Sequence, residues 1–457
     1  MLEGTETMAD AGSGGEAWLS GPSRFPPPIQ RNDELVTALL KSAAVVAAPY
    51  RYVPRVPQEI LDLIVDNMDD KATLQTCSVV CWAFVHSCRK RLFRDLCFMM
   101  SSDTPDGLYQ LFLCYPHLAS YVQSVTIYRL PNSSIWMRTG SLLPALLGLL
   151  TRVTKIALFG CWGDWLDMAP SLASALLRIV SSGALERLHL LTVTNVPAPF
   201  LRASLTVPNL SMFHVGLDSN APDVMLPRAG SSPEFLNLSL DSKVGKILEF
   251  MLQNPHYFSN VRRLAVNPIP HSINSSANLA LVLSAVQSTL ERLDIQWHEL
   301  HIDHFDKSRF DYSRLTCLRT IQLHIVMEQH TLPPYLPWVL DRLRASNPRL
   351  TSLAIVLHLP AAVVASSSGA DPVVISKIDA LLGGGEAFPA LQDAHITVIP
   401  ESSPPSLVPD YVAFFAAHLP KARRRGVLRV EQGWRKRGEA VMPLLPYIEV
   451  WPHRKKG

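Results

Sequence analysis

The residues best suited to metal chemistry are Cys77, Cys81 and Cys88, with His86 between them and Cys97 beyond. Thiolate and imidazole groups are preferred zinc ligands, but structural zinc sites usually take Cys pairs about two to four residues apart on turns. The offsets of 4 and 11 residues instead predict that the three cysteines share one face of a helix. Thiols on such a face behave as small apolar residues. We therefore expect core packing here and no metal site.

Three other patterns could support catalysis or nucleotide binding, and each lacks a necessary part. Gly383-Gly384-Gly385 has no flanking Lys-Ser/Thr of a phosphate loop, so we expect a flexible linker there. Cys161 follows a predicted strand, but no motif positions a His to activate its thiol. A G-x-S-x-G nucleophile elbow is absent. The sequence thus predicts a protein that is not an enzyme and binds no cofactor.

Composition narrows the class of protein further. Hydrophobic residues make up 48% of the 457 residues and charged residues 18%, which is typical of a folded chain. A net charge of +3 gives no general attraction to nucleic acid or to anionic membranes. The N-terminus lacks the basic flank and apolar run of a signal peptide, and the apolar stretch at 142–150 is too short to span a bilayer. Seven scattered cysteines fit a reducing compartment, so we expect a cytoplasmic or nuclear protein.

A repeat extends over most of the chain and determines the predicted architecture. It consists of an apolar residue, two variable residues, an apolar residue, one variable residue and a third apolar residue. Ten copies follow this pattern, the fifth in degraded form: Val122-Val125-Ile127, Val153-Ile156-Leu158, Leu185-Leu188-Leu190, Leu210-Phe213-Val215, Leu236-Leu238-Leu240, Val261-Leu264-Val266, Leu290-Leu293-Ile295, Leu318-Ile321-Leu323, Leu350-Leu353-Ile355 and Leu391-Ala394-Ile396. Their spacing is typical of leucine-rich repeats.

The physical reason for this pattern is that alternate side chains of a strand share a face. One strand cannot bury that face alone, whereas stacked repeats form a parallel sheet over one continuous core. Helical stretches at 170–179, 244–252, 279–286 and 336–343 would connect the end of one strand to the start of the next. Only the copy with Cys161 has the Asn or Cys that a regular repeat places five residues after its central apolar residue. We therefore expect an irregular solenoid, and an ordinary α/β domain with parallel strands is the alternative.

A different, helical pattern occupies residues 53–98. Pro57 stands at a predicted helix start, and Ile60, Leu61, Ile64, Val65 and Met68 follow at helical spacing. A second apolar face runs from Leu74 to Val85, and a third, basic helix carries Leu92, Phe93 and Leu96. We expect this segment to be separable, so that its deletion leaves the repeat region folded.

The stretch Val56-Pro57-x-Glu59-Ile60-Leu61-x-x-Ile64, followed by Leu74 and by Cys77 to Phe84, resembles an F-box. It is especially similar to the expanded F-box family of mushroom-type fungi, as is the stretch from Val153 to Pro197. The resemblance implies a three-helix module that binds a Skp-type adaptor, which joins a cullin and a RING subunit in a ubiquitin ligase. It also implies which residues meet the adaptor: Val56, Pro57, Ile60, Leu61, Ile64, Leu74, Val80 and Trp82. These apolar residues could also form the core of the module itself.

The expected fold is thus α/β, with four parts. A disordered arm occupies residues 1–52, the F-box-like module 53–100, the irregular leucine-rich-repeat-like solenoid 101–400, and a C-terminal cap with a basic tail 401–457. The tail contains the run from Lys421 to Arg425 and ends in Arg454, Lys455 and Lys456. It could serve nuclear import or nucleic-acid contact, but a solvated tail is the expectation, and nucleic acid is not an expected partner.

Residues that flank the central apolar position of each repeat should point away from the core, onto the concave face of the sheet. Lys155 and Arg187 would then be neighbours, as would Arg263 and Arg292, and likewise His189 and His214. Stacked cations suit a carboxylate or phosphate, so these six residues are the predicted binding site for an acidic or phosphorylated target.

Two functions remain open from the sequence. The first is the substrate receptor of a Skp–cullin–F-box ligase, which holds a target protein near ubiquitin and does no bond chemistry itself. The second is a leucine-repeat scaffold for protein interactions without a ligase role.

Overall fold

The computed structural model describes residues 56–99, 104–129, 142–218, 232–240, 243–268, 275–298, 312–326, 336–346, 349–359, 372–400 and 411–432. All of them belong to one compact unit, residues 32–435. The predicted disordered arm at 1–52 lies outside the described residues, as does the end of the basic tail after Gln432.

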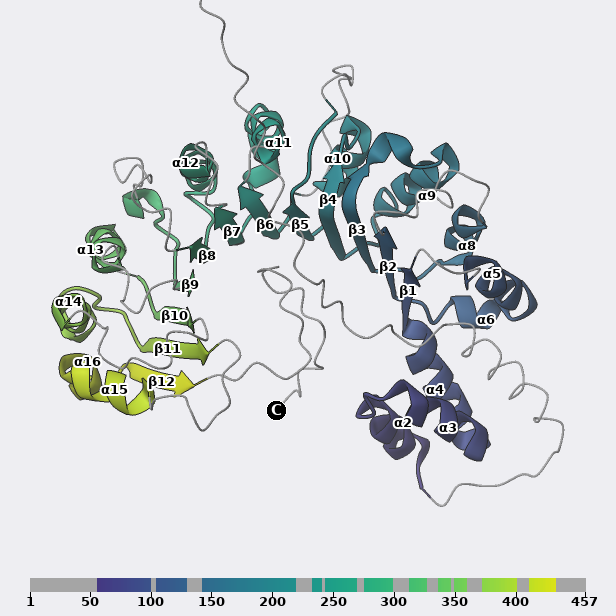
Figure 1. Cartoon of the computed structure of the whole chain (residues 1–457), viewed down its shortest axis with the longest axis horizontal. Coiled ribbons are helices and arrows are strands. Elements are labelled where there is room, and N and C mark those ends of the chain that lie inside the picture. Colours follow the sequence, from purple (N-terminus) through teal and green to yellow (C-terminus); the bar gives the residue numbers. More distant parts are fainter. Residues whose placement is uncertain are drawn as a thin grey trace, which may run out of the picture. The chain divides into compact units, whose positions relative to one another are not determined.

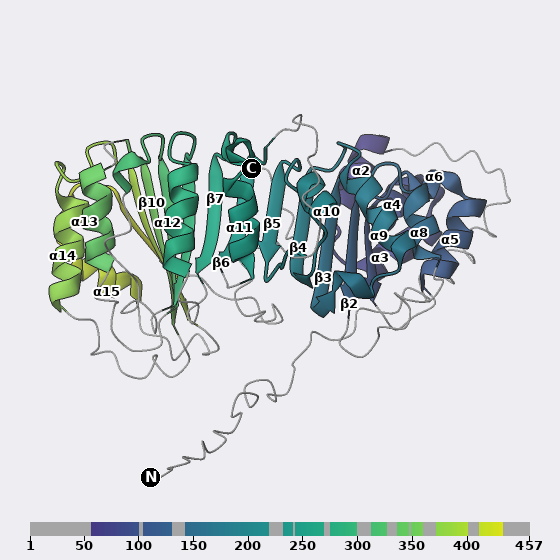
Figure 2. The same ribbon diagram turned by 90° about the horizontal axis from the view of Figure 1, so that it is seen from above.

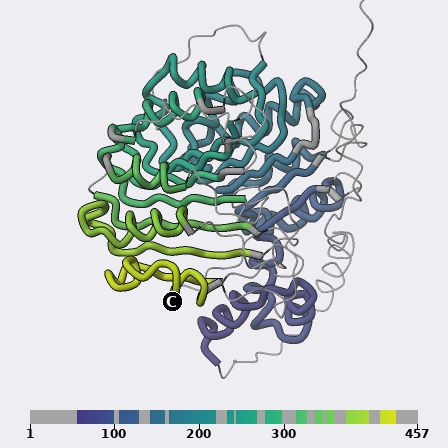
Figure 3. Tube along the Cα trace, turned by 60° about the vertical axis from the view of Figure 1, so that its left-hand side comes forward, coloured from purple at the N-terminus to yellow at the C-terminus, as the bar shows by residue number. Residues whose placement is uncertain are grey.

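The strands of these residues form one parallel sheet of 12 strands, in which each strand pairs with the next one along the chain. Figures 2 and 3 show the strands side by side in chain order. This strand order confirms a solenoid with a parallel sheet. The strands are β1 Asp95–Met99, β2 Ser124–Arg129, β3 Lys155–Asp164, β4 Arg187–Thr194, β5 Asn209–Phe213, β6 Phe235–Leu240, β7 Arg263–Pro268, β8 Arg292–His298, β9 Thr320–Val326, β10 Ser352–Leu359, β11 Asp393–Pro400 and β12 Leu428–Gln432.

Helices return the chain on one side of the sheet, as Figure 1 shows. The four helical stretches expected from the sequence are confirmed as α9, α11, α12 and α13. We call the opposite side the helix-free face. The helices that accompany the sheet are α5 Thr104–Cys114, α6 Pro116–Ala119, α8 Leu143–Leu149, α9 Pro170–Val180, α10 Ala198–Ser204, α11 Val244–Leu252, α12 Ser275–Ala285, α13 Leu336–Ser346, α14 Pro372–Gly383, α15 Tyr411–His418 and α16 Pro420–Arg424, with the 3-10 helices η1 Trp165–Asp167, η2 Pro255–Phe258 and η5 Tyr312–Arg314.

The apolar repeat residues fill one continuous core between the sheet and these helices. Leu188 and Leu190 of β4 are both fully buried, and their register partners in β3 and β5 are buried beside them. Since every strand contributes two such alternate side chains, the core continues from β1 to β12.

The fourth repeat lies in a different frame from the predicted one, Leu210-Phe213-Val215. Leu188 pairs with Leu210, and Leu190 pairs with Met212 rather than with Phe213. Met212 is fully buried in the core. The correct copy is therefore Val207-Leu210-Met212, and Phe213 belongs to the helix-free face by alternation.

The sheet extends beyond the 101–400 range at both ends. Strand β1 pairs with β2, and Leu96, which was expected in a third helix, is a strand residue. Phe93, Leu96 and Phe98 are part of the solenoid core. The sequence predicts that segment 53–98 is separable from the repeats, but its last residues belong to the sheet and to the solenoid core. At the other end, β12 pairs with β11.

The predicted irregularity is localised at the C-terminal ends of β3, β4 and β5. The register between β3 and β4 shifts after Phe159. Thr192, Asn195 and His214 all have positive φ, near 50°. Asn195 donates a hydrogen bond from Nδ2 to Asp164 Oδ2 at 2.6 Å, which links the ends of two neighbouring turns of the solenoid.

Gly383 and Arg425 are structural, which corrects the expectations for these two residues, whereas Lys421, Arg423 and Arg424 of the basic run are exposed. A Cβ at Gly383 would lie 2.3 Å from the Cβ of Lys421, so α14 and α16 approach each other closely only because residue 383 is Gly. Arg425 donates to the carbonyl oxygens of Leu382 (3.1 Å) and Phe388 (2.6 Å). These two contacts fix the C-terminal end of α14 rather than leaving Arg425 solvated.

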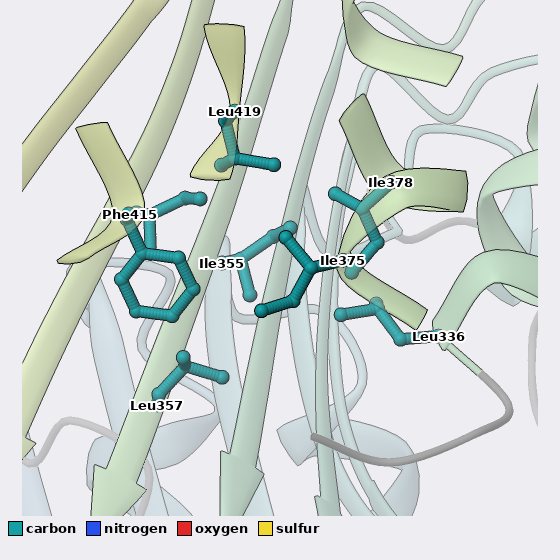
Figure 4. Close-up of a pocket in the computed structure, with 8 residues that line it drawn as sticks. Leu336, Ile355, Leu357, Ile375, Ile378, Phe415 and Leu419 are labelled. Atoms are coloured by element: carbon teal, nitrogen blue, oxygen red, sulfur yellow. The ribbon is translucent and has the colours of Figure 1, made fainter. Parts of the chain in front are cut away.

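A gap in the core lies between β10, β11 and the last helices, and Figure 4 shows that carbon side chains line it. Ile355 and Leu357 face Ile375, Ile378 and other apolar residues across this gap. Such a lining offers no polar group to orient a ligand, so we regard it as loosely packed core. The lining residues are Leu336, Ile355, Leu357, Ile375, Ile378, Ile396, Phe415 and Leu419.

Candidate functional site

Three helices precede the sheet: α2 (Gln58–Asp66), α3 (Lys71–Val80) and α4 (Trp82–Arg94). Asp70 caps α3, because its carboxylate accepts hydrogen bonds from the N–H groups of Ala72 (3.3 Å) and Thr73 (2.7 Å). Pro57 is the N-cap of α2, and its carbonyl accepts from Ile60 N–H at 3.1 Å. The local sequence thus explains where α2 and α3 begin.

These helices share a small core of their own. Val65, Leu74, Cys88 and Leu92 are buried together, and Met68, Cys77 and Phe84 pack against them. Leu61 is also buried. Two of the eight predicted adaptor-contact residues, Leu61 and Leu74, therefore lie inside the module.

The other six predicted adaptor-contact residues lie at the surface. Val56, Ile60, Ile64, Val80 and Trp82 are exposed, and so is Pro57. Leu63 and Val79 are also exposed and were missed, although Leu63 sits next to the predicted residues on α2. Seven of the twelve large apolar side chains that are exposed among the described residues fall in this short segment. We call them the exposed apolar set: Val56, Ile60, Leu63, Ile64, Val79, Val80 and Trp82.

The cysteines do not share one helix face, so that prediction is wrong. Helix α3 ends at Val80, and Cys81 is extended between two helices. Cys88 lies in the small core, where burial, with a smaller contribution from Cys77, raises the pKa of its thiol to about 11. A thiol with that pKa is not a nucleophile at neutral pH. No cluster of three metal-ligating side chains occurs in the part of the chain that the structure describes.

The module continues directly into the sheet. Helix α4 ends at Arg94 and β1 begins at the next residue. Tyr121 Oη lies 3.1 Å from His86 Nδ1, and the two rings pack edge to face with centroids 5.5 Å apart. This contact joins α4 to the turn that precedes β2.

The second candidate site is the helix-free face, where the predicted basic pairs are neighbours. Lys155 is the register partner of Arg187, and Arg263 is the register partner of Arg292. His189 instead pairs with Ser211. His214 follows the end of β5 with φ of 50°, so the expected His189–His214 pairing is wrong. The pairing was expected because the predicted repeat took Phe213, rather than Met212, as a core residue.

The two basic pairs have different surroundings. Arg292 Nε donates to Asp294 at 3.0 and 3.2 Å, and Arg292 Nη2 donates to Gln322 Oε1 at 2.8 Å. Asp294 offsets one of the two positive charges of this pair, and burial raises the pKa of its carboxyl, an effect that hydrogen bonding from Arg292 opposes. Further along, Arg429 pairs with Asp393 at 3.4 Å, and His395 lies 3.3 Å from Glu431.

Beside Arg292 the hydrogen-bond chain continues to two histidines. The amide nitrogen of Gln322 lies 2.8 Å from His324 Nε2, which must therefore accept, and His324 Nδ1 lies 3.5 Å from His358 Nε2. Burial, then the charge of Arg292, lowers the pKa of His324 to about 4. Both effects hold this imidazole neutral.

Charges of both signs act on Lys155. Burial lowers the pKa of Lys155, and the charges of Arg187 and Arg94 lower it further, while Asp95 and Glu186 act in the opposite direction and more weakly. Burial, followed by Arg187 and Lys155, lowers the pKa of His189 to about 4. Four residues further along β3 and its neighbour β2, Phe159 and Tyr128 stack with centroids 4.6 Å apart.

Among solved structures, the chain is similar to the leucine-rich repeat-containing protein LegL7 from Legionella pneumophila. The two share 15% sequence identity, with a TM-score of 0.36 over 71% of this chain and 96% of that chain. No family model matches the sequence, and no curated protein matches it. The repeat architecture therefore rests on the chain's own strand register.

Within the described residues, no helix is both long enough and apolar enough to cross a membrane.

Proposed function

We propose that this chain is the substrate receptor of a Skp–cullin–F-box ubiquitin ligase. In this proposal the helical module docks a Skp-type adaptor, and the solenoid holds the protein to be modified. The observation that carries the proposal is the exposed apolar set on a three-helix segment that resembles an F-box. Concentrated exposed apolar side chains mark interaction sites.

Packing explains why a partner suits this surface. A small helical module buries few side chains, here Val65, Leu74, Cys88 and Leu92 with their neighbours, and gains stability when a partner covers its apolar surface. Each square ångström of apolar surface removed from water contributes about 25 cal/mol. Val80 is the most exposed member of the set, at 73%, and Leu63 and Trp82 follow at 59% each. We propose that Val80 and Trp82, two residues apart in the sequence, lie at the centre of the adaptor contact.

Co-expression with a Skp-type adaptor tests the proposal. The full chain should co-purify with the adaptor, and the double variant Ile60→Asp with Val80→Asp should lose it, because each change would bury an unpaired carboxylate in the interface. Both positions are exposed in the free chain, so the fold should be retained. Leu281→Asp on α12 is the matched control, since Leu281 is equally apolar and is 48% exposed.

Two results would refute the adaptor role. One is failure of the wild-type chain to co-purify, and the other is unchanged capture by the double variant. Either would favour the alternative, an interaction scaffold that uses the solenoid without a ligase. The 12-stranded solenoid itself is compatible with both functions.

A further inference from the structure

A strip of accessible aromatic side chains leads from the helical module onto the first turn of the solenoid. Tyr115, His117, Tyr121 and His86 follow one another, with ring centroids 6.3, 6.1 and 5.5 Å apart. Trp82 precedes His86 by four positions on α4, and residues at this spacing are neighbours on one helix face. We call these five residues the aromatic strip.

The aromatic strip is open to solvent along its length. Trp82 is 59% exposed and Tyr115 is 37% exposed. His86 and His117 are also exposed, and Tyr121 is half-buried. A partner can therefore reach each of these rings at the surface of the protein.

The strip crosses the junction between the module and the solenoid. Trp82 and His86 belong to α4, whereas Tyr115 is the N-cap of α6 and His117 lies in its first turn. Helix α6 packs against α4, and both lie at the end of the solenoid that carries the module (Figure 1). The 3.1 Å contact between Tyr121 Oη and His86 Nδ1 holds the two halves of the strip together.

The size of stable protein interfaces indicates that an adaptor contact extends beyond the exposed apolar set. A standard interface takes about 20–30 residues from each side, and the exposed apolar set has seven. Interfaces are enriched in Trp and Tyr and depleted in Asp, Glu and Lys. The other exposed residues between α2 and α3 include Asp66, Asp69, Asp70 and Lys71, so the aromatic strip is the better continuation.

The chemistry of the strip also indicates what a partner must present to it. Imidazole and phenol groups can both donate and accept hydrogen bonds. Lys90 is exposed four positions beyond His86 on α4, and no acidic residue belongs to the strip. The complementary surface has apolar side chains opposite Trp82 and hydrogen-bond acceptors, carboxylates included, opposite the two histidines and Lys90.

We propose that the aromatic strip is a second part of the adaptor-binding surface, so that a Skp-type adaptor contacts the solenoid as well as the module. In this arrangement Trp82 and His86 supply the module's part, and Tyr115, His117 and Tyr121 supply the solenoid's part. The identity of the partner rests on the proposed function. A partner that touches both parts fixes the direction in which the solenoid points from the adaptor.

Affinity measurements between the full-length chain and a purified Skp-type adaptor test the strip. Tyr115→Ala combined with His117→Ala should weaken binding about tenfold or more, because two exposed rings of the contact are lost. His256→Ala is the matched control for His117, since His256 is also exposed and also follows a Pro at the start of a short helix, η2. It should leave the affinity unchanged.

A second measurement uses the wild-type chain and needs no substitution. Cys114 is exposed and directly precedes Tyr115, whereas Cys317 is half-buried and lies just before β9. Bound adaptor should slow the reaction of Cys114 with N-ethylmaleimide several-fold and leave the rate at Cys317 unchanged. Mass spectrometry of the proteolytic peptides reports the two thiols separately.

The proposal is overturned if the adaptor leaves the reaction rate of Cys114 unchanged, or if the folded double variant binds the adaptor as tightly as wild type. In either case, loss of binding by Ile60→Asp with Val80→Asp would preserve the ligase role and confine the adaptor to the module. Failure of the wild-type chain to bind the adaptor would instead overturn the ligase role and the strip together.

Discussion

The carboxylate of Asp379 accepts two hydrogen bonds from the backbone N–H of Lys421, at 2.9 and 3.1 Å, across 42 residues of sequence. It also accepts one from the N–H of Ala422 at 3.0 Å. These N–H groups belong to the first turn of α16, which has no partner for them within the helix. Asp379 is itself buried on α14, so one carboxylate joins the last two turns of the solenoid.

Replacement of Asp379 by Ala should destabilise the C-terminal end of the solenoid. The change leaves buried N–H groups of α16 without an acceptor, which costs about 1–3 kcal/mol. Urea unfolding of the variant should show this loss in the free energy of unfolding. Asp341→Ala, at an exposed position of α13, is the control and should change stability by less than about 0.5 kcal/mol. Equal stability of the two variants would contradict the capping role.

A second prediction concerns the contact between Gly383 and Lys421. The methyl group of Gly383→Ala would meet the Lys421 backbone at 2.6 Å and its Cβ at 2.3 Å. Because the nearest atoms include backbone, α14 and α16 must separate, and we expect a loss of about 1–3 kcal/mol. Gly385→Ala offers the comparison, since nothing lies within 4 Å of its added Cβ. Thermal unfolding of the two variants side by side measures the difference, and an unaffected Gly383→Ala would mean that the helices do not pack so closely.

Alanine substitutions test which side chains of the helical module form its core and which lie at its surface. Leu74 is 3% exposed and Val80 is 73% exposed, although both were predicted as adaptor contacts. Leu74→Ala should cost about 2–5 kcal/mol of module stability, whereas Val80→Ala should be nearly neutral in the free chain. Hydrogen exchange of the α3 and α4 amides reports the local stability. If Val80→Ala accelerates exchange as much as Leu74→Ala does, Val80 is part of the core.

The pH dependence of stability should reflect two half-buried histidines, His189 and His324. Burial lowers the folded-state pKa values of His189 and His324 to about 4, below the ordinary value of about 6.5 for the unfolded chain. The unfolded state therefore binds more protons, and stability falls as the pH drops from about 6.5 to about 4. His324→Gln should flatten this part of the profile. Chemical denaturation at a series of pH values measures it, and parallel profiles for the variant and the wild type would exclude His324 as a source.

Much of the fold is predictable from the sequence, because the repeat is a local pattern. Leu188, Leu264 and Leu293 were assigned to the core from spacing alone, and all are buried. The error at Phe213 arose because two overlapping frames, 207-210-212 and 210-213-215, both satisfy the apolar pattern. Only pairing with Leu190 on the neighbouring strand distinguishes them.

The candidate sites were less accessible to sequence reasoning. The basic pairs followed from the repeat, and the register confirms that they are neighbours. The interaction of Arg292 with Asp294 and Gln322 could not be foreseen, because it depends on rotamers and on contact between strands. Asp379 and Lys421 are far apart in sequence and belong to no repeat position, so no local pattern indicates their contact.

Deletion variants separate the module from the solenoid, and the position of the cut determines the outcome. Removal of residues 56–80 takes away α2 and α3 but leaves α4 and β1, which carry Phe93, Leu96 and Phe98 into the solenoid core. The solenoid should then unfold at nearly the same denaturant concentration as in the full chain. Removal of residues 56–98 also deletes β1 and uncovers Val125 and Ile127 of β2, which are buried in the full chain.

A solenoid that has lost its terminal strand exposes apolar core and an unpaired edge. The longer deletion should therefore lower the denaturation midpoint and promote aggregation, as measured by urea unfolding followed by circular dichroism and by light scattering. The shorter deletion uncovers Cys88 and Leu92 of α4, which the longer deletion removes altogether. Aggregation of the shorter variant only would therefore assign the effect to α4. Equal midpoints for both deletions would show that β1 contributes no stability to the sheet.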